Sequence, residues 1–153
     1  MSAAMEIYVD ADACPVKDEV LRVAERHQLT MHLVANSYIR FVAHPLVKRV
    51  VVQEGPDAAD DWIAERATKG DIVVTQDIPL AARCLKNGAK VVGNTGKPYT
   101  DGGIGMALAM RDLSSHLRET GNSNSFNPAF TAADRSRFLQ TLEQLVQDVK
   151  RGR

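Results

Sequence analysis

The sequence has few cysteines and no long apolar run. Each of these shortages excludes some classes of protein. Cys14 and Cys84 are its only two cysteines, too few and too far apart for a disulfide framework or a cysteine-based zinc site. No stretch approaches the about 18 consecutive apolar residues of a membrane span. The first residues also lack the basic start and apolar core of a secretory signal. We therefore expect reduced thiols, a cytoplasmic location and no membrane partner.

An excess of charge of either sign is missing as well. The 19 lysines and arginines balance the 19 aspartates and glutamates, so the formal net charge is zero. This balance argues against a strongly basic nucleic-acid coat protein, but it leaves room for an enzyme that contacts a few phosphates. Hydrophobic residues make up 44% and charged residues 25% of 153 residues, which is typical of a soluble globular protein. We predict a single domain over residues 1–153.

What the chain does contain is a regular alternation of short apolar runs and helical patterns. Such alternation indicates crossover connections and a parallel sheet. We predict an α/β fold of three layers: a five-stranded parallel sheet in the order 3-2-1-4-5, helices on both faces, and a C-terminal helix that packs back on the sheet. The polar segment 121–130 before this last helix is expected to be flexible. Strands are expected at residues 7–9, 31–35, 50–53, 71–75 and 91–92, and helices from Pro15 onward and at residues 58–69, 79–87 and 131–151.

Aspartates follow the strands that should lie at the centre of this sheet. Parallel sheets bind ligands beyond the carboxyl ends of their strands, where the strand order reverses. Strands one and four are neighbours there, and the helix between strands three and four begins at the same edge. Carboxylates gathered at one place repel each other unless a cation is present, and oxygen ligands favour Mg²⁺ or Mn²⁺ over zinc. The candidate metal ligands are Asp10, Asp12, Asp60, Asp61 and Asp77.

Each acid taken alone has a simpler interpretation. Asp10 and Asp12 fit a polar strand end and helix cap, and Asp77 fits a helix cap. Asp60 and Asp61 fit solvated acids in a first helical turn. For Asp101, at an expected helix start, the capping role is favoured, and Cys14 is expected to be a buried small residue. The candidates for substrate contact are Asn36, Ser37, Arg40 and Thr75.

Three stretches of the chain, residues 8–16, 59–63 and 74–81, resemble the YaiI/YqxD family of bacterial proteins, which are regarded as having a PIN-like fold. The wider PIN-like group is similar to metal-dependent ribonucleases with acids at these places. The resemblance implies a strand-one acid at Asp10, a helix acid at Asp60 and a Thr-x-Asp element ending at Asp77. Asp12 is an extra acid. PIN-like ribonucleases often have a further acid after strand five. In this chain only Asp101 is available for that role, and it stands well beyond the strand.

Three functions remain open at this point. The leading hypothesis is metal-dependent phosphodiester hydrolysis, with RNA as the expected partner and Asp10, Asp12, Asp60 and Asp77 as catalytic residues. The Asp10-x-Asp12 pair is also similar to haloacid-dehalogenase-like phosphatases, but those place an insertion after strand one, where this chain has Pro15. A PIN-like scaffold that binds RNA or protein without catalysis is the third possibility.

Overall fold

The computed structural model describes residues 5–12, 14–53, 55, 57–119 and 130–152, with side chains left undescribed for residues 114–119. The segment 121–130, expected to be flexible, lies outside these residues except for Phe130. The elements are β1 (Glu6–Asp10), α1 (Lys17–His27), β2 (Thr30–Ala35), β3 (Val47–Val51), α2 (Ala58–Arg66), β4 (Ile72–Val74), α3 (Ile78–Lys86), β5 (Lys90–Val92), β6 (Pro98–Tyr99), α4 (Ile104–Glu119) and α5 (Ala132–Lys150).

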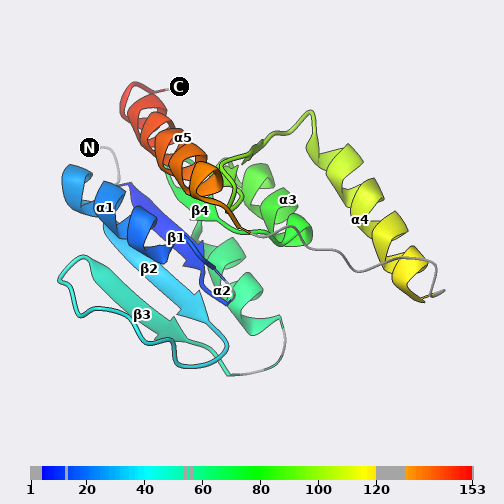
Figure 1. Cartoon of the computed structure of the whole chain (residues 1–153), viewed down its shortest axis with the longest axis horizontal. Helices are drawn as coiled ribbons and strands as arrows, with labels where there is room; N and C mark the ends of the chain where they lie inside the picture. The colour runs from blue at the N-terminus through cyan, green and yellow to red at the C-terminus, as the bar shows by residue number, and fades with distance from the viewer. Residues whose placement is uncertain (1–4, 13, 54, 56, 120–129, 153) are drawn as a thin grey trace.

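One sheet runs through the molecule in the order β3-β2-β1-β4-β5-β6. The first five strands pair in parallel, so the predicted order 3-2-1-4-5 is confirmed. The sixth strand was not predicted: it has two residues, pairs antiparallel with β5 and begins with Pro98. Proline is tolerated at such an edge, because the missing N–H faces away from the ladder. The strands β1 and β2 point their carboxyl ends toward the beginnings of α2 and α3 (Figure 1).

Helices cover both faces of the sheet, as predicted. Because side chains alternate along a strand, each strand contributes to two separate cores. On one face the fully buried Ile7, Val9 and Met31 pack against α1 and α5. On the other face Tyr8 and Val34 pack against α2 and α3. The C-terminal helix buries Phe138, Leu142 and Val146 in the first core, which confirms that it docks on the sheet (Figure 1).

Local signals in the sequence explain most element ends. Thr131 and Asp134 form a reciprocal capping box at the start of α5. Gly88 has a φ of 93° after α3, a left-handed conformation that costs glycine little. α1 begins at Lys17 rather than Pro15, because Pro15 and Val16 form a turn first.

The fourth helix stands apart from the two helical layers. It packs on α3 and projects away from the sheet (Figure 1). Its exposed face presents Met106, Met110 and Leu113 to solvent. Asp101 is exposed in the turn before this helix, where Thr100 Oγ1 accepts a hydrogen bond of 3.0 Å from the backbone N–H of Gly103, so Thr100 takes the capping role expected of Asp101. In the described ranges, no helix combines the length and apolar character needed to cross a membrane.

The docking of α5 makes a simple stability prediction. Phe138 is fully buried, so Phe138→Ala should lower the free energy of unfolding by about 3–5 kcal/mol through lost burial and the cavity left behind. Urea unfolding followed by circular dichroism measures this change. The control Leu113→Ala, on the exposed face of α4, should change it by less than about 0.5 kcal/mol. Equal losses in the two variants would contradict the docking of α5 as the stabilising contact.

Candidate metal centre

The junction of β1 and β4 is organised by the hydroxyl group of Thr75. Thr75 is fully buried just after β4, and its Oγ1 donates a hydrogen bond of 2.8 Å to Asp10 Oδ2. The same Oγ1 accepts a hydrogen bond of 2.9 Å from the backbone N–H of Asp77. One hydroxyl therefore links the strand-one acid to the segment that carries the strand-four acid. Its burial favours this positioning role over the substrate contact that we expected of Thr75.

Asp77 has a structural role in addition to its position at the carboxyl edge of the sheet. Its Oδ1 accepts a hydrogen bond of 2.9 Å from the backbone N–H of Leu80, so Asp77 is the N-cap of α3. The capping interpretation is thus confirmed. It does not remove Asp77 from the acidic site: burial is the main cause of the raised pKa of Asp10 and Asp60, and the negative charge of Asp77 adds to both shifts.

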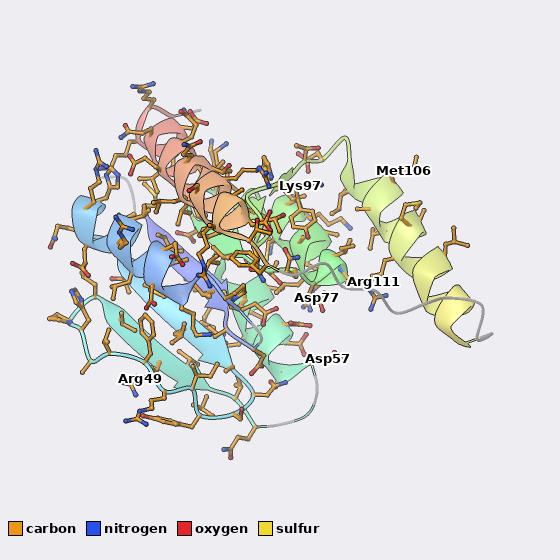
Figure 2. The ribbon with its side chains drawn as sticks, viewed as in Figure 1. Arg49, Asp57, Asp77, Lys97, Met106 and Arg111 are labelled. Atoms are coloured by element: carbon orange, nitrogen blue, oxygen red, sulfur yellow. The ribbon has the colours of Figure 1, made fainter. Side chains whose placement is uncertain are left out.

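Asp60 lies in the first turn of α2 and is the acid most affected by its surroundings. Partial burial and the charges of Asp77 and Asp10 raise the pKa of Asp60 to about 7. Burial also raises the pKa of Asp10; the hydrogen bond from Thr75 opposes this shift, and the charges of Asp77 and Asp12 add to it. Acids from three separate segments therefore act on one another at the predicted edge. Asp57 and Asp77 mark that edge at the beginnings of α2 and α3 (Figure 2).

Asp12 and Asp61 have other partners. The exposed Asp12 accepts a hydrogen bond of 3.0 Å at Oδ2 from the backbone N–H of Asn36, which ties it to the end of β2. Asp61 Oδ1 accepts a hydrogen bond of 2.8 Å from Arg83 Nη1, in an ion pair whose side chains are about half exposed. An arginine that already neutralises Asp61 makes it the weakest of the five predicted ligands. Asp12 stays relevant to the site through its charge, which contributes to the raised pKa of Asp10.

The donor atoms fit a hydrated hard cation better than a closed cage. Within the described residues, no group of three or more His, Cys, Asp or Glu side chains is placed to hold a metal ion together. Mg²⁺ does not require such a group, since it usually keeps several waters and takes one or two protein carboxylates. Burial, and after it the charges of neighbouring acids, raises the pKa of Asp10 and Asp60, and a bound divalent cation would oppose both effects. Carboxylates alone, without His or Cys, suit Mg²⁺ or Mn²⁺.

A polar contact beside the acids, between Gln76 and Asn94, was not predicted from the sequence. Gln76 Oε1 accepts a hydrogen bond of 2.6 Å from the backbone N–H of Asn94, which follows β5 at the same edge. The buried Asn94 in turn accepts a contact of 3.8 Å from Cys14 Sγ at its Oδ1. Burial raises the pKa of the Cys14 thiol, so this cysteine is an inert packing residue, as expected. The available signal was the position of Asn94 directly beyond a buried strand.

The remaining predicted residues lie on the connection between β2 and β3. Asn36 is half-buried where this connection begins, while Ser37 and Arg40 are exposed on it. Arg40 lines a cavity that it shares with Cys14 and the start of α1. Of these three residues, Asn36 lies next to Asp12 through its backbone N–H, and Ser37 and Arg40 follow it on the connection to β3.

A doubly wound parallel sheet with carboxylates at its switch point defines the class: a three-layer α/β protein with an acidic site at the carboxyl edge. The chain belongs to the YaiI/YqxD family, whose model, described as "Uncharacterized BCR, YaiI/YqxD family", matches residues 8–148.

Curated relatives match over nearly their whole length. A UPF0178 protein of Parvibaculum lavamentivorans is 64% identical, over 95% of this chain and 96% of its own. Proteins of the same designation in Rhizobium meliloti and Rhodospirillum rubrum are 61% and 58% identical, over 95% and 97% of this chain and 99% and 100% of their own. No solved structure matches the chain. The PIN-like fold implied by the family resemblance therefore stays a prediction, consistent with the strand order.

The raised pKa of Asp60 predicts how stability depends on pH. An unfolded aspartate ionises near pH 4, whereas folded Asp60 keeps its proton up to about pH 7. Its favourable contribution is complete below about pH 4 and is lost as the pH rises through about 7. In EDTA, Asp60→Asn should therefore stabilise the protein by about 1–2 kcal/mol at pH 8, after allowance for screening by solvent, and hardly at all at pH 4.

Urea unfolding at the two pH values measures this difference. Asp61→Asn is the matched control, because it changes the neighbouring acid, whose partner is the exposed Arg83. We expect no gain in stability from the control at pH 8. An Asp60→Asn variant as stable as the parent at pH 8 would show that the acids do not repel one another there.

Proposed function

We propose that the protein is a Mg²⁺- or Mn²⁺-dependent phosphodiesterase that acts on RNA. The observation that carries this proposal is that Asp10, Asp60 and Asp77 come from three segments to one half-buried edge, where burial, and after it the charges of neighbouring acids, raises the pKa of Asp10 and Asp60. Concentrated negative charge of this kind destabilises a fold, so its presence favours a functional cause. The family resemblance, with acids at the places used by PIN-like ribonucleases, supports the choice of reaction and of RNA.

The proposed roles follow from the contacts of each acid. Asp10 and Asp60 would hold the ion, directly or through water, because burial and the neighbouring acids disfavour their charged forms when no cation is bound. Asp77 contributes charge while its Oδ1 stays on the N-terminus of α3, so its position is fixed by the helix. Thr75 holds the carboxylate of Asp10 close to the backbone of Asp77 through the two hydrogen bonds of its hydroxyl group. When bound, the ion would lower the pKa of an attacking water and stabilise the charge of the leaving oxygen.

Asp12 has a supporting role in this proposal. Its bond to the backbone of Asn36 holds the exit of β2 close to the acids, and its charge adds to the field at Asp10. We propose that Asn36, Ser37 and Arg40 contact the substrate from that exit. A net charge of zero fits an enzyme with a few local phosphate contacts better than broad electrostatic binding.

Neutralising the central acids should stop cleavage while leaving the fold intact. Asn at position 10 can still accept the bond from Thr75, and Asn at position 77 can still cap α3. We expect Asp10→Asn and Asp77→Asn each to reduce Mn²⁺-dependent cleavage of labelled single-stranded RNA by about 100-fold or more. Asp61→Asn, whose charge is paired with Arg83, is the matched control and should keep activity within a few-fold.

Calorimetry with Mg²⁺ and Mn²⁺ tests the binding step separately. The parent protein should bind at least one ion, and Asp10→Asn should weaken this binding. A folded parent protein that binds neither ion and cleaves neither RNA nor DNA would overturn the proposed function.

A non-enzymatic scaffold is the second candidate, and one observation favours it. Within the described residues the carboxylates do not form a three-donor group, as they would in a preformed metal cage. Under this alternative the acids serve the cap of α3 and the exit of β2. Absence of metal binding, together with retained RNA or protein binding, would identify it. A dehalogenase-like phosphatase is disfavoured, because α1 begins at Lys17 and leaves no room for an insertion after β1.

A further inference from the structure

We infer that a single-stranded polynucleotide binds on a surface beside the acids, formed by the first turn of α1, the β2–β3 connection and β3. We call it the connection surface and define it by Lys17, Tyr38, Arg40, Phe41 and Arg49. The inference deepens the proposed function, because it names the state of the substrate and the side from which it approaches. Binding to this surface does not itself require cleavage.

A cavity forms the part of the connection surface nearest the acids. It has a volume of about 560 Å³ and lies between the start of α1 and the connection. Asp12 holds the beginning of the connection through the N–H of Asn36, and Cys14, two residues after Asp12, lines the cavity. The cavity therefore adjoins the segment that carries Asp12. The lining consists of Cys14, Pro15, Lys17, Asp18, Arg40, Phe41 and Val42.

The charges of this cavity suit a phosphate group. Lys17 and Arg40 contribute two cations against the single carboxylate of Asp18. Lys17 is held at the cavity by a hydrogen bond of 2.6 Å from its Nζ to the carbonyl oxygen of Cys14, which leaves its charge uncancelled. In the part of the chain that the structure describes, neither cation has an ion-pair partner within 4.0 Å. Lys17 also opens α1, whose N-cap residue Val16 offers no side-chain cap. The positive end of the helix adds to this field, and Asp18 and Glu19 in the first turn oppose it.

Aromatic rings next to these cations suit unpaired bases. Tyr38 is 67% exposed, an unusual position for a large ring. Arg49 fixes it: the Arg49 Nη1 donates a hydrogen bond of 2.7 Å to the Tyr38 hydroxyl oxygen, and the guanidinium carbon lies 5.6 Å from the ring centre. An exposed ring held still in this way is a platform on which a base can stack. Phe41, in the cavity wall, is a second ring on this surface and is partly buried against the first core.

The combination favours single strands over duplexes and over a protein partner. Bases in a duplex are stacked on each other and cannot reach a side-chain ring, whereas single strands expose their faces. The surface carries both cations, which suit phosphates, and aromatic rings, which suit the bases that such a strand exposes. Arg49 lies on the β3 side of the molecule, and Asp77 lies at the start of α3 (Figure 2).

Fluorescence anisotropy in EDTA tests the inference on the full chain without cleavage. The probe is a labelled oligouridine of about 12 nucleotides, a length within reach of one small domain. We expect the parent protein to bind this strand and to bind a duplex of equal length at least about tenfold more weakly. Tyr38→Ala and Arg40→Gln should each weaken binding of the strand about five- to tenfold.

Arg66→Gln is the matched control. Arg66 also stacks on an aromatic ring, that of Trp62 at 4.0 Å, but at the C-terminal end of α2, away from the acids. The Arg66→Gln variant should bind the single strand with the same affinity as the parent protein. Thermal unfolding of each variant confirms that a loss of binding is not a loss of fold.

The outcomes separate this inference from the proposed function. Binding that depends on Tyr38 and Arg40 without any metal-dependent cleavage would support the connection surface and count against the phosphodiesterase. Cleavage by a parent protein whose Tyr38→Ala and Arg40→Gln variants bind and cleave normally would overturn the surface and keep the enzyme. Equal affinity for duplex would overturn the assignment to single strands. No binding of oligouridine at up to about 100 µM protein would overturn it in favour of a protein partner.

Discussion

The buried hydroxyl group of Thr75 couples the central strands of the sheet to the acidic site. It donates to the carboxylate of Asp10 and accepts from the backbone of Asp77, so two segments far apart in sequence are held at hydrogen-bond distance. The apolar layers on both faces fix β1 beside β4. The hydrogen bonds of this hydroxyl group then position the end of β1 and the segment after β4 relative to each other. Like charges that would otherwise move apart are thereby kept close. The proposed chemistry depends on that closeness.

The sequence predicted the fold well because the relevant signals were local and repeated. Buried strands appeared as short apolar runs, and the crossover rule then ordered five of them correctly. The start of β3 was placed too late, because Lys48 and Arg49 interrupt its apolar pattern on an exposed edge. β6 was missed, since two residues that begin with a proline carry no strand signal of their own. These failures concern edges, where solvent rather than the core selects the side chains.

The candidate site was predictable at the level of elements but not of atoms. Topology alone placed Asp10, Asp60 and Asp77 at one edge, and in the structure the charges of Asp10 and Asp77 act on Asp60. The described residues nevertheless include no three-donor group placed to hold one ion. The pairing of Asp61 with Arg83 depends on how α2 and α3 lie against each other, which no pattern within either helix encodes. The same holds for the contact between Gln76 and Asn94. Predicting which side chains pair across two elements requires coordinates. Predicting which strand ends lie together requires only the order of the strands.

The two margins of the sheet also limit how this protein associates with others. At one margin stands β6, short and opened by Pro98; at the other stands β3, with the exposed cations Lys48 and Arg49. Neither margin offers an incoming strand a long, uncharged row of amides to pair with. Sheet extension between copies, the usual beginning of amyloid-like growth, is therefore disfavoured at both ends. Association should proceed instead through side-chain surfaces.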